Sequence, residues 1–165
     1  MTKGAVSVKQ YLKVDPWSIL EESFDPANHE ISESIFSIGN GYMGQRANFE
    51  EQYSGPSLQG SYMAGVYYPD KTRVGWWKNG YPEYFAKVLN STNWIGINVF
   101  VDGVALDLAE CQVKDFVREL NMKEGYLYRR FTAVMKDGKE LAVEALRFVS
   151  IVRHEIGAIR YAGTP

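Results

Sequence analysis

The C-terminal third of the chain alternates apolar and polar side chains with the two-residue period of half-buried β-strands. Two such runs, 126–135 and 141–150, are joined by Lys136-Asp137-Gly138-Lys139, and Asp-Gly is typical of tight hairpin turns. We therefore predict a β-hairpin. An arginine interrupts each apolar face, which consists of Leu127, Arg129, Phe131, Ala133 and Met135 in the first run and Leu141, Val143, Ala145, Arg147 and Val149 in the second.

Similar alternation predicts further strands. The run 94–101 places Ile95, Ile97, Val99 and Val101 on one face; it ends at Asp102-Gly103, after which 104–108 can return beside it. Short strands are also predicted at 113–120 and 156–161. The helical pattern is weak and indicates short helices at 16–22 and 84–89 only. Many strands with hairpin turns and little helix predict a single all-β domain over 1–165, an antiparallel β-sandwich.

Composition limits the possible functions. The chain has 165 residues, of which 45% are hydrophobic, enough to bury one core of ordinary domain size. A net charge of −2 with scattered Lys and Arg argues against nucleic-acid binding. The longest apolar run, 94–101, is far shorter than the ~20 residues that span a bilayer, and no apolar run of signal-peptide length occurs near the N-terminus. Together with the lone Cys111, which cannot form an internal disulfide, this predicts a cytoplasmic protein.

The segment 73–85 is unusually rich in aromatic residues. It is interrupted by Gly75, Gly80 and Pro82, which disfavour a helix or a central strand. Exposed aromatics stack well on the apolar face of a sugar ring and also bury well against another protein surface. The segment can equally fold onto its own domain. The candidate binding residues here are Trp76, Trp77, Lys78, Asn79, Tyr81 and Tyr84.

An earlier segment, 36–51, contains Gly39-Asn40-Gly41-Tyr42-Met43-Gly44, which matches the G-x-G-x-x-G pattern of dinucleotide-binding turns. Residues 45–55 lack the apolar periodicity of the helix that such a turn requires, so we interpret Asn40-Gly41 as a hairpin turn. Glu50 and Glu51 could suggest a glycosidase carboxylate pair. Neighbouring residues on a strand point to opposite faces, however, so we expect them to be structural or interface residues.

Taken together, these segments are similar to a known family. The pattern F-S-x-G-N-G-Y-M-G-x-R followed by F-E-E, the run 65–73, and W-W-K-N-G-Y-P-E-Y-F resemble the N-terminal domain of glycoside hydrolase family 65. The resemblance extends from Trp17 to the end of the chain. Family members commonly carry Gly where Ala47 stands here, a change that disfavours a positive φ at that position.

The resemblance implies a function for a longer protein. The family contains maltose, trehalose, kojibiose and nigerose phosphorylases with some hydrolases, and 60–94 looks like the maltose-specific members. It implies inverting phosphorolysis of an α-linked glucose disaccharide with inorganic phosphate as co-substrate and no cofactor. The fold implied is part of a larger β-sandwich followed by an (α/α)6 barrel that carries the catalytic Glu. We expect this chain to be a truncated accessory domain with open sheet edges.

No catalytic residue is therefore assigned to this chain. The aromatic candidates above, together with Asn40, Tyr42, Arg46 and Glu50, are expected to pack against the barrel, line the active-site rim or contact the second subunit of a homodimer. Arg46 and Arg73 could bind phosphate or sugar hydroxyls, although an ion pair is the simpler expectation. His29 and His154 are isolated and predict no metal site.

Two alternatives stay open. A trehalose or kojibiose phosphorylase, or a hydrolase of the same family, would share this domain and differ in the barrel. A free-standing sandwich that binds glycans through the aromatic segment, without chemistry, belongs to another class of protein.

Overall fold

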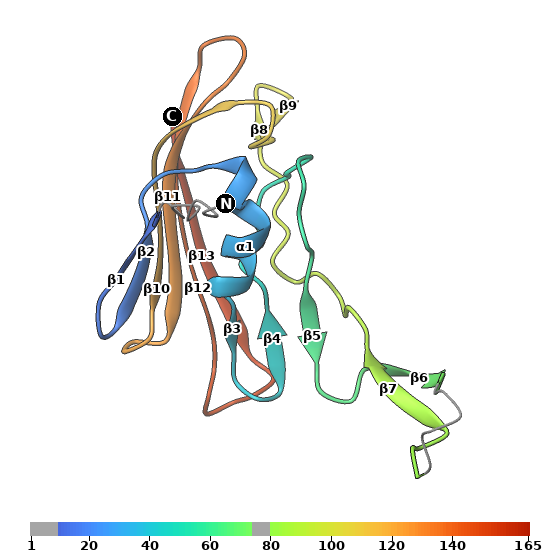
Figure 1. Ribbon diagram of the computed structural model, residues 1–165. Helices are drawn as coiled ribbons and strands as arrows, with labels where there is room; N and C mark the ends of the chain where they lie inside the picture. The colour runs from blue at the N-terminus through green and yellow to red at the C-terminus, as the bar shows by residue number, and fades with distance from the viewer. Residues whose placement is uncertain (1–9, 74–79) are drawn as a thin grey trace, which may run out of the picture.

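The computed structural model describes residues 10–73 and 80–165, and its largest element is a six-stranded antiparallel sheet (Figure 1). The four C-terminal strands follow one another as neighbours, and the two N-terminal strands join them at one edge. In spatial order the strands are β1 (Leu12–Val14), β2 (Ser18–Glu21), β10 (Gln112–Asn121), β11 (Tyr126–Val134), β12 (Glu140–Val149) and β13 (Gly157–Thr164).

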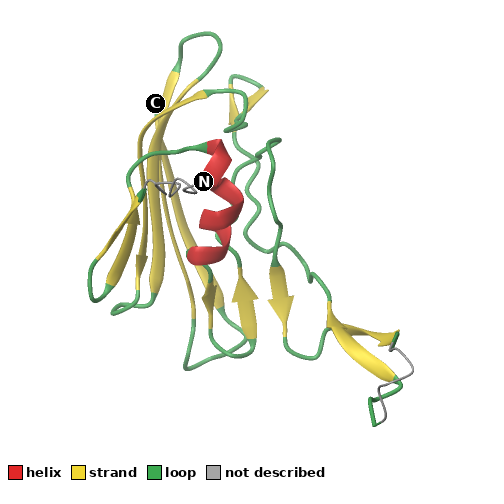
Figure 2. Ribbon diagram, viewed as in Figure 1, coloured by secondary structure: helices red, strands yellow, loops and turns green. Residues whose placement is uncertain are grey.

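Of the shorter elements, all but β6 and β7 lie beside one face of this sheet. A three-stranded sheet and two separate hairpins are formed by β3 (Ile38–Gly39), β4 (Met43–Gln45) and β5 (Ser61–Met63), by β6 (Tyr67–Lys71) with β7 (Tyr84–Val88), and by β8 (Phe100–Val101) with β9 (Val104–Ala105). A 3-10 turn, Pro26–Asn28, leads into α1 (His29–Ile35). Within the described residues, α1 is the only α-helix (Figure 2).

The core lies between the inner face of the six-stranded sheet and the segments that cross it. Its main cluster joins strand residues such as Phe116, Phe131 and Val143 to Phe49 and Leu106 from the crossing segments. A smaller cluster unites Phe36 and Ala47 with Leu127 beside α1. Buried and exposed residues alternate along most of β12, so one face of this strand points into the core and the other toward the surface. The predicted period of two therefore separates core from surface.

The predicted hairpins are confirmed. β11 and β12 pair from Leu127 opposite Arg147 to Val134 opposite Glu140, and Gly138 in the connecting turn has φ 87°. At the β8–β9 turn, Asp102 and Gly103 have φ of 49° and 82°, the left-handed geometry that favours Asp-Gly in two-residue hairpins. The Asn40-Gly41 turn likewise joins β3 to β4. The all-β antiparallel architecture is thus confirmed.

Both predicted helices are wrong. Residues 18–21 form strand β2, which pairs with β10 through Arg118–Asn121, and residues 84–88 form strand β7, which pairs with β6. In each case pairing with a distant segment outweighs a weak local preference. The helix that does form, α1, was not predicted, and its sequence HEISESI offers few strong helix formers.

The strand predicted at 94–101 is correct in its faces but not in its extent. Ile95 is buried, Ile97, Val99 and Val101 are half-buried, and the residues between them are more exposed from Gly96 onward. Only Phe100–Val101 belongs to a hydrogen-bonded strand. The rest runs extended across the core, held by single backbone bonds such as Ile97 N to Glu50 O at 2.7 Å. The return segment 104–108 likewise forms a strand only at Val104–Ala105.

Candidate functional site

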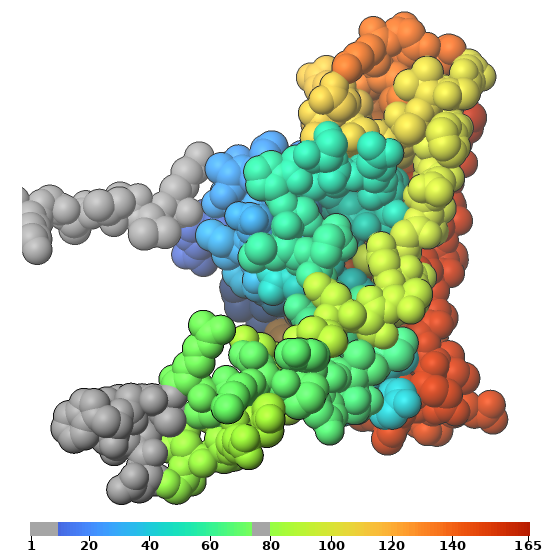
Figure 3. Space-filling view, turned by 90° about the vertical axis from the view of Figure 1, so that its right-hand side faces the viewer, coloured from blue at the N-terminus to red at the C-terminus, as the bar shows by residue number. Residues whose placement is uncertain are grey.

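The β6–β7 hairpin, which we call the arm, is an extended and exposed feature that is rich in apolar residues. It projects from the body of the domain in two views (Figures 1 and 3). Every residue of β7 is exposed, as are four of the five in β6. Thr72 N donates to Glu83 O and the Thr72 hydroxyl to Pro82 O, so the pairing extends beyond the strands. A two-stranded ribbon is marginally stable alone in water, so the arm is built to be covered.

The two faces of the arm differ in chemistry. In an antiparallel pair, residues directly opposite share a face. Tyr67 with Val88, Pro69 with Ala86 and Lys71 with Tyr84 form one face, which is largely apolar. Tyr68 with Lys87 and Asp70 with Phe85 form the other, where Lys87 and Asp70 make an ion pair. The apolar face is the better contact surface because it carries a charge only at its tip.

Two of the predicted binding residues lie on the described part of the arm. Tyr84 is exposed in β7. Tyr81 is exposed before it and packs edge-on against Phe85, with ring centroids 6.1 Å apart. The other four aromatic-segment candidates, Trp76, Trp77, Lys78 and Asn79, lie outside the described residues.

Asn40 fastens the β3–β4 turn to the β12–β13 loop. Its side-chain amide donates to Ser150 O at 2.7 Å and to His154 O at 2.9 Å. Its side-chain oxygen accepts from Tyr42 N and Met43 N at 3.0 and 2.7 Å. All hydrogen-bonding groups of the side chain are therefore used. The Tyr42 ring remains exposed at the tip of the turn, so the turn presents an aromatic residue from a fixed position.

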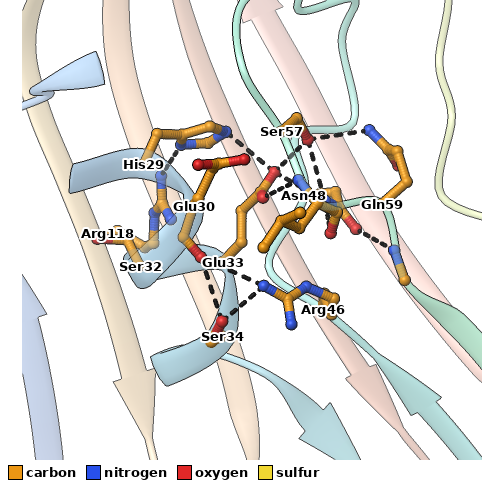
Figure 4. Close-up of polar contacts among 12 residues, drawn as sticks. His29, Glu30, Ser32, Glu33, Ser34, Arg46, Asn48, Ser57, Gln59 and Arg118 are labelled. Atoms are coloured by element: carbon orange, nitrogen blue, oxygen red, sulfur yellow. Dashed lines mark hydrogen bonds and ion pairs between the residues drawn. The ribbon is translucent and has the colours of Figure 1, made fainter. Parts of the chain in front are cut away.

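Arg46 forms hydrogen bonds to α1 and takes part in no ion pair with another described residue. Its Nη2 donates to the Ser34 hydroxyl at 2.6 Å and to Glu30 O at 3.2 Å (Figure 4). The side chain passes directly over Gly60, where a Cβ would overlap Arg46 Cδ. Arg46 thus ties the end of β4 to the helix.

Glu33 is the centre of a buried polar network between α1 and the segment 48–60 (Figure 4). One carboxylate oxygen accepts from Asn48 Nδ2 at 2.7 Å and from the Ser57 hydroxyl, and lies 3.1 Å from His29 Nε2. The other accepts from Leu58 N at 2.7 Å. These hydrogen bonds outweigh the opposing effect of burial and lower the pKa of Glu33 to about 2. Glu33 is therefore a fixed anion.

His29 completes this network as a neutral ring. It is buried and stacked on Phe49, with ring centroids 4.3 Å apart. Arg118 Nη2 lies 3.4 Å from His29 Nδ1. Burial lowers the pKa of His29, and Arg118 contributes in the same direction. The ring accepts at Nδ1 and directs Nε2–H toward Glu33, an arrangement that suits the neutral tautomer.

Three arginines lie buried on the inner face of the sheet, one on each of β10, β11 and β12. Arg118 stands opposite Arg129 in the strand register, and its guanidinium lies over the rings of Phe49 and Phe116 at 5.2 and 5.3 Å. Burial lowers the pKa of Arg118 to about 10, opposed by Glu21, whose carboxylate lies 3.3 Å from Arg118 Nε. Arg147 Nη1 donates to Glu50 at 2.7 Å.

Glu50 and Glu51 converge on a single group, contrary to the sequence prediction that they point apart. The segment that carries them is not a strand, and both carboxylates accept from Arg129 Nη2 at 2.5 Å. Burial opposes ionisation of Glu50, but Arg147 and Arg129 outweigh it and lower its pKa. The Tyr161 hydroxyl donates to the second oxygen of Glu51 at 2.7 Å. Glu50, a predicted rim residue, lies inside the domain.

Sequence reasoning missed most of this network. Arg129 and Arg147 were noted only as interruptions of apolar faces, although an arginine on a core face needs a buried carboxylate. The i,i+4 spacing of His29 and Glu33 would have been informative had α1 been recognised. No cluster of three or more His, Cys, Asp or Glu side chains in the described ranges could hold a metal ion.

The network also determines what this domain can do chemically. Its buried carboxylates Glu21, Glu33, Glu50 and Glu51 are all engaged by arginines or hydrogen-bond donors. It is built to hold the segment 46–60 on the sheet. The arm and the turns beside it are among the exposed parts of the domain.

Comparison with known proteins is consistent with this arrangement. The family model described as "Glycosyl hydrolase family 65, N-terminal domain" matches residues 19–165. The chain belongs to glycosyl hydrolase family 65. A solved structure titled "Putative kojibiose phosphorylase from human microbiome" is similar to this chain, with a TM-score of 0.79 and 31% sequence identity. The match covers 93% of this chain and 20% of that one.

Curated family 65 relatives are also similar over nearly the whole chain. Maltose phosphorylase of Bacillus subtilis is 49% identical over 93% of this chain and 20% of its own length. Alpha,alpha-trehalose phosphorylase and kojibiose phosphorylase of Thermoanaerobacter brockii are 34% and 31% identical over 92% and 96% of this chain. The chain thus spans about a fifth of the length of these relatives. No helix in the described ranges is long and apolar enough to cross a membrane.

Proposed function

We propose that the whole protein is an inverting phosphorylase that converts maltose and inorganic phosphate to β-glucose 1-phosphate and glucose. The observation that carries this proposal is the difference in identity, 49% to a maltose phosphorylase against 34% and 31% to trehalose and kojibiose phosphorylases. All three comparisons extend over at least nine-tenths of this chain, so the difference does not come from unequal coverage.

The chemistry needs a general acid to protonate the departing glycosidic oxygen while phosphate attacks the opposite face of the sugar. Phosphate is itself the nucleophile, so no second carboxylate is needed as base, and neither a cofactor nor a metal ion is required. The three buried arginines of this domain are already held against aromatic rings and carboxylates. The phosphate site and the general acid therefore belong to the catalytic domain.

This domain supplies contacts to the catalytic domain. The end of the arm that carries the exposed Tyr81 and Tyr84 is the surface suited to this role. The enzyme is a cytoplasmic homodimer, in accord with a single unpaired cysteine and with exposed aromatic residues at the end of the arm.

The test is to incubate the whole protein with maltose in the presence and absence of phosphate and to follow glucose 1-phosphate by proton NMR. The proposal predicts release that requires phosphate and an initial product in the β configuration. Glucose release at the same rate without phosphate would indicate a hydrolase and refute it.

A further inference from the structure

A neutral groove lies at the base of the arm, where three separate segments of the chain meet. It is a hollow of about 380 Å³ lined by residues that include Tyr42, Gly44, Tyr62, Val66, Tyr67 and Val88. This volume lies within the range of small-molecule sites. The groove is distinct from the buried network, and none of its described lining residues takes part in the ion pairs of the domain.

The walls of the groove are held together by backbone bonds. Ala64 N donates to Tyr42 O at 2.8 Å and extends the pairing of β4 with β5. Val66 N donates to Met63 O at 3.2 Å and closes the turn between β5 and β6. Leu89 N donates to Val66 O and joins the end of β7 to this turn. The groove is therefore a feature of the fold rather than a gap between loose side chains.

Three tyrosines and several glycines give the groove its chemistry. Tyr42 and Tyr67 are 45% and 56% exposed. Within the described ranges, the hydroxyls of Tyr42, Tyr62 and Tyr67 form no hydrogen bond with another residue. Gly44 stands opposite Tyr62 in the strand register and leaves its ring uncovered on that side. The surface combines flat apolar rings with unpaired hydroxyl groups.

These properties favour one class of ligand. None of the described residues that line the groove is charged, so a phosphate or carboxylate group would find no cation there. A purely apolar partner would bury the tyrosine hydroxyls without hydrogen bonds, which is unfavourable. A neutral sugar can stack the apolar C–H face of its ring on the tyrosine rings, and its hydroxyl groups can form hydrogen bonds with the tyrosine hydroxyls. We propose that this groove binds a neutral oligosaccharide, separately from the catalytic site.

Hydrogen–deuterium exchange of the whole protein tests this proposal, with maltoheptaose as the probe. We expect the sugar to slow exchange at 41–44, 62–67 and 86–88. Because exchange is read at the groove itself, the result does not depend on whether the enzyme cleaves maltose. Protection confined to the catalytic domain, or no protection at any of the three segments, would overturn the proposal while leaving the proposed phosphorolysis intact.

Neighbouring tyrosines provide a matched pair of variants. Tyr67 and Tyr68 are 56% and 57% exposed but lie on opposite faces of β6, and of the two only Tyr67 lines the groove. Tyr67→Ala should weaken the maltoheptaose affinity measured from groove protection by about tenfold, and Tyr68→Ala should leave it unchanged. Tyr67→Phe, which keeps the ring and the fold of the arm, should cost about two- to fivefold. Equal affinity in all three variants and the wild type would overturn the proposal.

Discussion

Arg147 and Glu50 form a buried ion pair, with Nη1 2.7 Å from Oε1, between strand β12 and a segment that is not itself a strand. The same arginine donates to the backbone oxygens of Asn48 and Arg46 at 2.9 and 3.0 Å. One guanidinium therefore holds three consecutive even-numbered positions of the segment 46–50 against the sheet. This contact links the segment that follows the β3–β4 hairpin to the core.

Arg147→Met should strongly destabilise the domain. It leaves the Glu50 carboxylate with one guanidinium in place of two and removes the donors to two backbone oxygens, and breaking a buried ion pair from one side costs roughly 3–5 kcal/mol. The melting temperature of the whole protein measures the effect, and hydrogen exchange of the segment 46–51 shows where the structure is loosened. Lys114→Met is the control, since the Lys114–Glu140 pair is largely exposed and such pairs contribute less than about 1 kcal/mol. Equal effects of the two variants would show that the buried Arg147–Glu50 pair stabilises the domain no more than an exposed pair does.

Asn40→Asp should release the β12–β13 loop without disturbing the β3–β4 turn. The aspartate keeps the oxygen that accepts from Tyr42 N and Met43 N but loses the donor to Ser150 O and His154 O. Loss of these bonds should cost roughly 1–3 kcal/mol and speed hydrogen exchange at 150–156. Asn98→Asp, at an exposed position away from both turns, should change neither quantity. Unchanged exchange at 150–156 in Asn40→Asp would show that the amide does not hold the loop.

The stability of the domain should fall as the pH drops below 4.5. Because the pKa of Glu33 is lower in the folded domain, about 2, than its ordinary value of 4.5, its contribution is complete above pH 4.5 and is lost between pH 4.5 and 2. His29, whose pKa is also lowered on folding, adds a loss that begins below pH 6.5. Melting temperatures measured from pH 7 to 3 report the losses of stability due to both Glu33 and His29.

Glu33→Gln should reduce the loss of stability below pH 4.5, at the cost of a lower melting temperature at pH 7. Glu30→Gln on the exposed side of α1 is the matched control and should retain the wild-type dependence. An unchanged slope below pH 4.5 in Glu33→Gln would assign the acid sensitivity to other carboxylates.

Tyr84→Ala should impair the whole enzyme if the arm contacts the catalytic domain or the second subunit. Tyr84 is 52% exposed on the largely apolar face of the arm, so within this domain its truncation removes little. A covered tyrosine at an interface, by contrast, typically contributes more than about 1 kcal/mol. We expect a lower melting temperature or slower phosphorolysis, with partial recovery in Tyr84→Phe. Unchanged melting and turnover in Tyr84→Ala would remove the arm from the interface. From the sequence alone, Trp77→Ala is also expected to lower stability or activity in the whole protein.

The sequence predicted those parts of the fold that depend on local pattern. The β11–β12 hairpin was recognisable because Asp137-Gly138 separates two long runs of period two, and Asp102-Gly103 marked the β8–β9 turn in the same way. The failures occurred where pairing is non-local. Ser18–Glu21 becomes a strand because β10, about a hundred residues later, lies beside it, and nothing within residues 16–22 indicates that partner.

The same difference between local pattern and non-local contact decides which parts of the candidate site were predictable. The exposure of Tyr42, Tyr81 and Tyr84 followed from aromatic residues in turn-rich segments. The position of Glu50 did not, because its neighbours Arg129 and Arg147 come from strands some eighty and a hundred residues away. A glutamate next to a turn motif resembles a surface residue until the arginines on the sheet are placed beside it.

The most direct test of the central claim compares three disaccharides at a fixed phosphate concentration. Glucose 1-phosphate release by the whole protein should be rapid with maltose and at least a hundredfold slower, as kcat/KM, with trehalose and kojibiose, roughly 3 kcal/mol of discrimination. A preference for trehalose or kojibiose would keep the family and contradict the proposed specificity.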